Sequence, residues 1–344
     1  MANQYKFSFG PWNIHCGADP FGPVVRDELS FDEKLTFYRK LGFEGVQFHD
    51  DDAVPDLNEL TPQQVANRAK AVKKQLEDHG LEAEFVAPRL WEDPRTIDGA
   101  YTANDPQHRE YALERSRRTI DIANALETDL VVLWLAREGT YIRESKDSKK
   151  AVDLLVQAIN AMLDYEPHMR FAIEPKPNEP MDQAFIPTTG HAIGLAYLCN
   201  DPSRVGVNIE SAHAILAGLD PSDEMGYALA HNKLWTVHLN DQNGLKFDED
   251  KTFGSVDIRR AFNQVRILET YNYGQNGEYV GLDVKAMRTQ KSGVSSKHLI
   301  NSRRIFLRLV DLVRSLDEQH TQDLIKQRDY EELDFVILNH LMGG

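Results

Sequence analysis

The residues of this chain best suited to chemistry centre on one stretch, residues 171–180, which reads Phe-Ala-Ile-Glu-Pro-Lys-Pro-Asn-Glu-Pro. Its apolar start predicts a β-strand, and the three prolines end that strand and stiffen the loop after it. Residues i and i+2 of an extended segment point the same way, so Glu174 and Lys176 would face one cavity. A carboxylate there can hold a metal ion, and a nearby ammonium can polarise a carbonyl or alkoxide oxygen. A Glu-x-Lys pattern taken alone is usually a pair of solvated charges.

Further acids and imidazoles come at or soon after the ends of other apolar runs: His49, Asp52, Glu210, His213, His238, Asp248, Asp250 and Asp283. Brought to one mouth, the carboxylates of Glu174, Glu210, Asp248, Asp250 and Asp283 would repel one another strongly unless cations intervene. Five carboxylates against the one ammonium of Lys176 leave four negative charges, which two divalent ions would balance. Oxygen-rich coordination with one or two imidazole ligands suits Mg²⁺, Mn²⁺ or Co²⁺. Each residue alone has an ordinary explanation, such as a turn acid or a loop cap, so the prediction depends on their joint placement.

The elements that must position these residues alternate along the chain. Eight apolar runs are each followed by a loop and, in most cases, by an amphipathic helical pattern, at a spacing that suits βα units. The runs are residues 6–12, 45–49, 83–86, 130–134, 170–174, 205–210, 234–240 and 279–283. This rhythm predicts an α/β fold, a (β/α)8 TIM barrel, whose active site would lie at the carboxyl ends of its strands. A two-domain doubly wound fold is the alternative, but no linker separates two halves and no Gly-rich phosphate loop follows the first run.

The helix signals also suggest where the barrel ends. A capping box at residues 30–33 and a Thr61-Pro62 start open two of the expected helices. The last barrel helix is expected to end near residue 316. We therefore expect a catalytic barrel domain over residues 1–317 and a short C-terminal extension, an arm or a packed terminal helix, over residues 318–344.

Composition narrows the class of protein. The chain has 344 residues, 39 basic and 54 acidic side chains, and a formal net charge of −15. This acidic balance, without a basic run, argues against a nucleic-acid partner. No apolar run approaches the roughly 20 residues of a membrane span, and the start of the chain lacks the apolar core of a signal peptide. The two cysteines, Cys16 and Cys199, imply no disulfide framework. We expect a soluble cytoplasmic protein.

Several motifs resemble those of the xylose isomerases, nearest the shorter actinobacterial type. The resemblance extends from residue 7 to about residue 285. The matching pieces are residues 7–12, 19–22, 48–52, 137–139 and 171–180, residues 206–208 with Glu210 and His213, residues 239–240, and Asp248 and Asp250 ahead of residues 253–254. The resemblance implies a sugar substrate, two divalent metal ions per subunit, and a homodimer or homotetramer.

It also implies roles for individual residues. The first ion would be held by Glu174, Glu210, His238 and Asp283, and the second by Glu210, His213, Asp248 and Asp250. His49, oriented by Asp52, would open the sugar ring, and Lys176 would contact the O1 atom of the substrate. The substrate-binding residues would be Trp12, Phe21, Trp91, Trp134 and Asn208, with Phe21 reaching in from a neighbouring subunit. Such a site fits a 1,2-hydride shift, which needs two substrate oxygens held in a plane, neutralised charge and the exclusion of water.

The chain departs from this family at several places. His238 stands where the family motif, His-x-Asp-Leu-Asn, has Asp. Ala87 and Trp91 stand where the family has Thr and Phe, with Arg89 between them, and Cys16 replaces a second tryptophan. The C-terminal extension is also much shorter than the family's wrapping arm.

Three functions compete for this sequence. The first is a two-metal aldose–ketose isomerase that interconverts D-xylose and D-xylulose, together with D-glucose and D-fructose. The second is a one-metal ketose 3-epimerase, favoured by His238, because related barrels use a histidine ligand from the seventh strand. The third is a catalytically silent sugar-binding paralogue, which would be expected to lack metal ligands. Lys176, His213, Asp248 and Asp250 favour the first function, because an epimerase has no need of a second metal's ligands.

Overall fold

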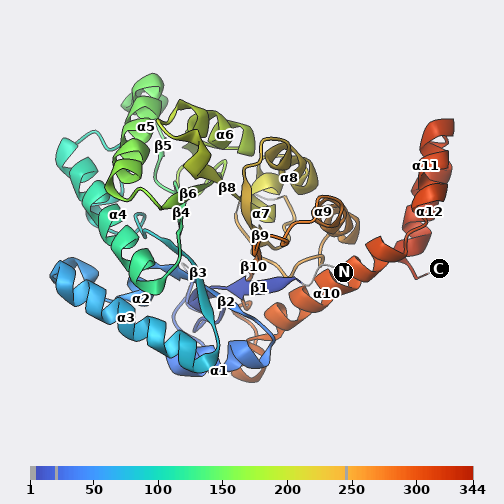
Figure 1. The fold of residues 1–344 in the computed structure, drawn as a ribbon, viewed down its shortest axis with the longest axis horizontal. Helices are drawn as coiled ribbons and strands as arrows, with labels where there is room; N and C mark the ends of the chain where they lie inside the picture. The colour runs from blue at the N-terminus through green and yellow to red at the C-terminus, as the bar shows by residue number, and fades with distance from the viewer. Residues whose placement is uncertain (1–4, 20–21, 245–246, 344) are drawn as a thin grey trace.

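A closed barrel of eight parallel strands forms the centre of the molecule, with helices around it (Figure 1). The computed structural model describes residues 5–19, 22–244 and 247–343. The barrel strands are β1 (Lys6–Phe9), β2 (Gly45–His49), β3 (Glu82–Ala87), β4 (Leu130–Trp134), β6 (Arg170–Glu174), β8 (Val205–Glu210), β9 (Leu234–Leu239) and β10 (Tyr279–Leu282). All eight predicted runs overlap these strands, so the predicted TIM barrel is confirmed.

The helices of the outer layer follow the strands in turn. They are α1 (Phe31–Lys40), α2 (Asp50–Ala53), α3 (Pro62–His79), α4 (Pro106–Leu126), α5 (Ser148–Tyr165), α6 (Thr189–Leu198), α7 (Ser211–Leu216), α8 (Pro221–Ala230), α9 (Ile258–Thr270) and α10 (Lys297–Ser315). The predicted caps are present: the side chains of Ser30 and Thr61 accept hydrogen bonds from the backbone N–H groups of Glu33 and Gln64. These caps hold α1 and α3 at the ends of their loops.

Strand register brings the chemistry-bearing residues to one edge. Trp134 lies opposite Glu174 across β4 and β6, and Glu210 lies opposite His238 across β8 and β9. The second alignment depends on a register shift between Val207 and Asn208 in β8. The carboxyl ends of these four neighbouring strands therefore present a continuous row of polar and aromatic side chains.

The apolar core lies mainly between the barrel and its helices. A second, smaller cluster fills the inside of the barrel, with Phe85, Ala87, Leu130, Val132 and Ala172. The buried Glu84 lies beside this cluster, where its carboxylate accepts hydrogen bonds from Ser8, Gln47 and Thr236. The interior is thus a packed floor beneath the mouth, as in other small barrels.

Two short elements tie the loops at the mouth together. β5 (Gly139–Thr140) and β7 (Gln183–Ala184) form an antiparallel pair, which joins the loop after β4 to the loop after β6. Behind this pair, the buried Glu138 accepts hydrogen bonds from the backbone N–H groups of residues 100–102. These contacts fix the loop that follows Trp134 and the loop that carries Lys176.

The C-terminal extension, for which the sequence predicts an arm or a packed terminal helix, begins after α10. It contains two helices, α11 (Glu318–Gln327) and α12 (Tyr330–Leu341), which contact each other and project from the end of α10 (Figure 1). Arg328, in the left-handed conformation, ends α11, and Asp329 begins α12 by capping it. An ion pair of 2.5 Å between Arg259 and Asp334 joins α12 to α9. Among the described residues, no helix is long and apolar enough to cross a membrane.

Candidate active site

A pocket of about 320 Å³ opens at the carboxyl ends of the barrel strands. Twelve of the residues that the sequence predicted for the site line it: Trp12, His49, Trp91, Trp134, Glu174, Lys176, Glu210, His213, His238, Asp248, Asp250 and Asp283. Asp52 and Asn208 lie behind the wall, where they contact His49 and Glu174. Phe21 lies outside the described residues, so its predicted reach into a neighbouring subunit stays a prediction.

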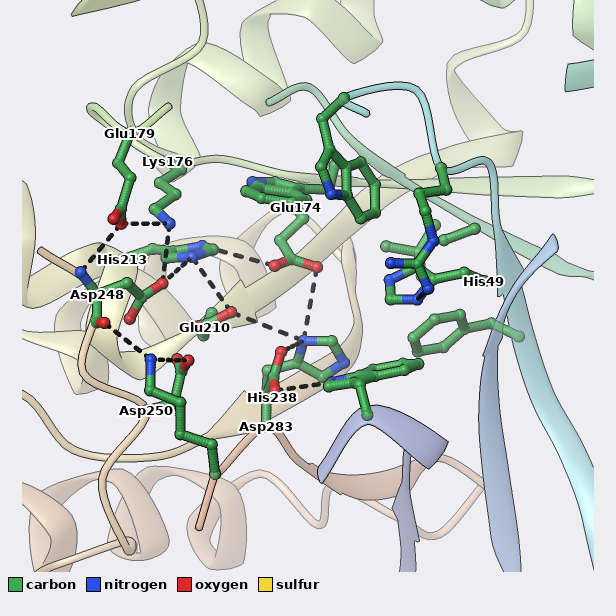
Figure 2. A pocket seen from close by; sticks show the side chains of 18 residues that line it. His49, Glu174, Lys176, Glu179, Glu210, His213, His238, Asp248, Asp250 and Asp283 are labelled. Atoms are coloured by element: carbon green, nitrogen blue, oxygen red, sulfur yellow. Dashed lines mark hydrogen bonds and ion pairs between the residues drawn. The ribbon is translucent and has the colours of Figure 1, made fainter. Parts of the chain in front are cut away.

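The pocket has two chemically different halves. We call the first the metal half, and it consists of Glu174, Lys176, Glu179, Glu210, His213, His238, Asp248, Asp250, Asp283 and Lys285. We call the second the aromatic half, and it consists of Trp12, His49, Arg89, Trp91 and Trp134. Figure 2 shows the labelled acids and imidazoles of the metal half gathered together and His49 set apart from them.

Three overlapping groups in the metal half have the spacing of metal ligands. They are Glu174 with Glu210 and His213, Glu210 with His238 and Asp283, and Glu210 with Asp248 and Asp250; within each group the ligand atoms lie within 4.8 Å of one another. Glu210 belongs to all three groups. A carboxylate shared in this way could contribute to more than one cation site. The group of Glu174, Glu210 and His213 joins residues that the resemblance assigns to two different ions, so the division into two ligand sets stays a prediction.

The two histidines lie among these carboxylates (Figure 2). Nδ1 of His238 is 3.5 Å from Oε2 of Glu174 and 3.8 Å from Oε2 of Glu210 and Oδ2 of Asp283. Nε2 of His213 is 3.1 Å from Oδ2 of Asp248 and 3.3 Å from Oε2 of Glu210. Each of these two nitrogens therefore faces carboxylate oxygens across a short gap.

Several buried polar atoms here have no hydrogen-bond partner among the described residues: both ring nitrogens of His238, Nδ1 of His213 and Oδ1 of Asp248. An unsatisfied buried polar atom costs about 1–3 kcal/mol, so such atoms are rare without a compensating ligand. A divalent cation among these acids would satisfy Nδ1 of His238, which faces Glu174, Glu210 and Asp283. The donor set therefore fits one or two bound metal ions.

Charge leads to the same conclusion. Six carboxylates and two ammonium groups line the metal half, which leaves four negative charges uncompensated. Burial, together with the charges of Asp248 and Asp283, holds the pKa of Glu210 well above its usual range. Burial and the neighbouring Asp248 likewise raise the pKa of Asp250. Both carboxyl groups are therefore harder to ionise when no cation is bound.

The imidazoles respond in the same way. Burial opposes a charge on His238, but Glu174 and the other acids outweigh it and raise its pKa well above the usual value. Burial opposes a charge on His213 as well, and Glu210 and Asp248 raise its pKa. For Glu174, burial would raise the pKa, but the two imidazoles outweigh burial and lower the pKa to about 2. The surrounding acids thus favour positive charge at both imidazoles.

Lys176 lies at the rim of the metal half with its side chain only 7% exposed. Its Nζ atom donates to Oδ2 of Asp248 at 2.9 Å and to Oε2 of Glu179 at 3.1 Å, and it lies 5.2 Å from the ring centre of Trp134. Burial would lower its pKa, but Asp248 and Glu179 outweigh burial and raise it. Lys176 is therefore a charged, fixed donor beside the possible ligands, as the Glu174–Lys176 spacing predicted.

Some supporting residues were not among those predicted for the site. Nδ2 of Asn240 donates to Oε1 of Glu210 at 2.8 Å, and Nζ of Lys285 donates to Oδ2 of Asp250 at 3.0 Å. Glu179 accepts from Lys176 and also from the backbone N–H of Asp248 at 3.0 Å. All three come at or near strand ends. Asn, Lys and Glu are also common on protein surfaces, so the sequence offered no reason to assign these three to the site. Asn208, which was predicted, donates to Oε2 of Glu174 at 2.7 Å.

In the aromatic half, rings enclose His49 on two sides. The ring centres of His49 and Trp12 are 4.2 Å apart, those of His49 and Trp91 are 5.0 Å apart, and those of Trp91 and Trp134 are 4.5 Å apart. Trp12 also joins the two halves, because its Nε1 donates to Oδ1 of Asp283 at 2.9 Å. Nδ1 of His49 lies 2.9 Å from Oδ2 of Asp52, so the predicted pair forms.

Comparison with known proteins places this geometry in context. A family model for the xylose isomerase-like TIM barrel matches residues 35–289. The chain is similar to the xylose isomerase of Thermus thermophilus, with 35% identity over 292 residues, which are 83% of this chain and 74% of that protein. It also resembles two solved structures, each 14% identical, which show the fold alone. One is a D-tagatose 3-epimerase-like protein (TM-score 0.64, covering 90% of this chain and 98% of that one), and the other is the IOLI protein with a bound zinc atom (TM-score 0.59, covering 89% and 98%).

Proposed function

The chain belongs to the xylose isomerase-like TIM barrel family, and we propose that it is a metal-dependent aldose–ketose isomerase that interconverts D-xylose and D-xylulose. D-glucose and D-fructose, which share the reacting end of the sugar, would be further substrates. The observation that carries the proposal is the position of Lys176 beside Glu210, His213 and Asp248. One cavity then offers both a site for two cations and a fixed ammonium group.

Two divalent ions bound in the metal half would act as Lewis acids toward the sugar oxygens. The residues that would hold them are those of the three groups around Glu210, and Mn²⁺, Co²⁺ or Mg²⁺ suits their mixture of oxygen and nitrogen atoms. Lys176 would donate to O1 as negative charge develops there. The tryptophans would exclude water from the hydrogen that moves between C2 and C1. His49, beside Asp52, would assist the opening of the sugar ring.

A one-metal ketose 3-epimerase is the second candidate. His238 favours it, as does the likeness of the fold to a D-tagatose 3-epimerase-like protein. The rest of the metal half favours the isomerase, because an epimerase acting with one ion leaves Asp248, Asp250 and His213 without a purpose. A silent sugar-binding protein would not need so many unsatisfied ligand atoms in one place.

Metal content and product analysis test the proposal together. We expect about two divalent ions per chain and conversion of D-xylose to D-xylulose within a panel of pentoses and their ketoses. With D-xylose deuterated at C2, an isomerase using a hydride shift delivers the label to C1 of D-xylulose. A ketose 3-epimerase leaves this aldose unchanged and instead loses label to water from a ketose deuterated at C3. One ion per chain with 3-epimer products would replace this function by the second candidate.

We also propose that the chain forms a homodimer or homotetramer, as the resemblance to the family implies. The test is the mass of the active protein by light scattering. A fully active monomer would overturn the proposed association.

A further inference from the structure

Arg89 follows β3 in the wall of the aromatic half and contacts more charged groups than any other residue of that half. Its Nε donates to Oδ1 of Asp51 at 2.7 Å, and its Nη1 donates to Oε1 of Glu92 at 3.3 Å. Its guanidinium carbon lies 5.4 Å from the ring centre of Trp91. The side chain is 18% exposed, so these contacts hold the guanidinium in one position.

The remaining nitrogen, Nη2, meets the pair formed by His49 and Asp52. It lies 2.8 Å from Nδ1 of His49 and 3.2 Å from Oδ1 of Asp52. Nη2 carries two hydrogens, so it can donate to both atoms at once. Burial would lower the pKa of Arg89, but Asp52 and Asp51 outweigh burial and raise it, so the guanidinium stays charged and only donates.

Nδ1 of His49 therefore lies between a group that can only donate and a carboxylate that accepts. Only one of these two hydrogen bonds forms at a time, because a ring nitrogen either carries a proton or accepts one. Asp52 does not depend on the imidazole for a donor. Its Oδ2 accepts from the backbone N–H of His49 at 3.1 Å, and its Oδ1 accepts from Arg89. Arg89, in contrast, has Nδ1 as the acceptor at its shortest Nη2 contact.

We propose that Arg89 is a positioning residue that holds neutral His49 with its proton on Nε2, so that His49 meets the sugar as a fixed hydrogen-bond donor. This inference rests on the proposed isomerase function. As the bond between C1 and the ring oxygen breaks, negative charge gathers on that oxygen, and Nε2–H donates to it. The oxygen then takes a proton from water while the O1 hydroxyl gives one to water, so His49 keeps its own proton throughout. Trp12 and Trp91 hold the imidazole plane for this contact.

Nitrogen-15 spectra of histidine-labelled protein test the tautomer directly. Signals of His49 are identified by their loss in His49→Gln. In the parent at a pH where His49 is neutral, we expect the proton on Nε2. In Arg89→Ala we expect it on Nδ1, where it donates to Asp52. Arg89→Met keeps a long side chain but has no N–H donor, so it should show the same switch and serves if Arg89→Ala does not fold.

Arg95→Ala is the matched control. Arg95 also pairs with a carboxylate, Asp93, at 2.7 Å and lies over an aromatic ring, that of Tyr111, but it does not touch His49. We expect the parent tautomer in this variant. An unchanged His49 tautomer in both Arg89 variants, or a parent proton on Nδ1, overturns the proposal.

Kinetics then test the consequence. A three-carbon aldose is too short to close a ring, so the ratio of kcat/KM for D-xylose to that for the short sugar isolates ring opening. We expect this ratio to fall about tenfold in Arg89→Ala and to stay near the parent value in Arg95→Ala. A tautomer switch with an unchanged ratio overturns the role in ring opening. A parent that isomerises no aldose refutes the proposed function instead, and the spectra still decide what Arg89 does.

Discussion

The two halves of the pocket balance charge in different ways. In the aromatic half, Arg89 compensates the neighbouring acids, with Asp51 at 2.7 Å and Asp52 at 3.2 Å. In the metal half, the two ammonium groups of Lys176 and Lys285 face six carboxylates, which leaves four negative charges uncompensated. Each acid beside the aromatic half thus has an arginine partner, whereas the metal half has more carboxylates than ammonium groups.

Asp50, beside the aromatic half, shows how this fold completes a buried acid. Asp50 is fully buried, and its carboxylate accepts from Arg115 at 2.7 and 2.8 Å and from Thr119 at 3.1 Å. Glu210 is nearly as deep, but among the residues that the structure describes its carboxylate meets an amide and two imidazoles and no arginine or lysine. A buried carboxylate needs a compensating positive charge. Asp50 has an arginine for this purpose and Glu210 has none, so we expect an external cation beside Glu210.

Metal removal should have the largest effect, and that effect should arise in the metal half. We expect chelator treatment to abolish isomerisation, and Mn²⁺, Co²⁺ or Mg²⁺ to restore it, because the metal half alone lacks compensating charge. Bound ions should also stabilise the fold, by about 2.7 kcal/mol per site at a hundred times the Kd. Activity assays and thermal unfolding with and without chelator measure both effects. Full activity in a protein shown to be metal-free would contradict this account of the metal half.

Lys176→Met should have the next largest effect. We expect kcat for D-xylose and for a three-carbon aldose to fall alike, by about 10²–10³, since one fixed donor to developing charge contributes on that scale. Fold and metal content should stay near normal. Lys149→Met is the control, because Lys149 is an exposed lysine that pairs with Asp153. Activity within a few-fold of the parent would remove Lys176 from the catalytic residues.

His49→Gln should sharpen the contrast by affecting only one class of substrate. We expect about tenfold slower turnover of D-xylose and little change for a sugar that cannot close a ring. The effect should lie below the roughly 10²–10⁴ of full proton transfer, because His49 donates a hydrogen bond and keeps its proton. The exposed His191, changed to Gln, is the control. Equal slowing of both sugars would place His49 on the path of the hydride instead of at ring opening.

Metal binding in the metal half should depend on pH. The raised pKa values of His213, His238, Glu210 and Asp250 mean that the metal-free site holds protons that an ion must displace. Affinity should therefore rise with pH, by up to about tenfold per unit for each displaced proton. Raised imidazole pKa values also stabilise the metal-free fold fully below pH about 6.5, and that stabilisation is lost as pH rises through the folded values. Calorimetric titrations with metal at several pH values measure the affinity, and thermal unfolding of the metal-free protein measures its stability. A pH-independent affinity would contradict the first expectation.

His238→Asp should give the smallest effect, a change of ion preference. An imidazole ligand favours Mn²⁺ and Co²⁺, whereas an added carboxylate favours hard Mg²⁺. We expect the ratio of Mg²⁺ to Co²⁺ affinity to rise a few-fold in the variant. The control is His231→Asp, since His231 lies away from the pocket beside Tyr197. An unchanged preference would mean that His238 does not set the choice of ion.

Much of the barrel could be predicted because its signals are local. Apolar runs bounded by caps, prolines and glycines define β2, β4, β6 and β8 to the residue or nearly so. α6 was missed because Gly190 and Gly194 lower the helix propensity of a segment that tertiary packing nevertheless holds helical. For the C-terminal extension the sequence predicted an arm or a packed terminal helix, and it did not indicate the turn at Arg328 between the two helices.

The eight βα units and the types of residue at the strand ends could be predicted from the sequence. The spacing of apolar residues and the chemistry of possible ligands are properties of short segments. Only the tertiary structure decided which of these residues meet. The register shift in β8 places Glu210 opposite His238, and Glu210 thereby joins all three ligand groups. The contact between Arg89 and His49 joins residues 40 positions apart, after two different strands. Register and loop packing depend on how distant segments fit together, so no local pattern in the chain could have predicted them.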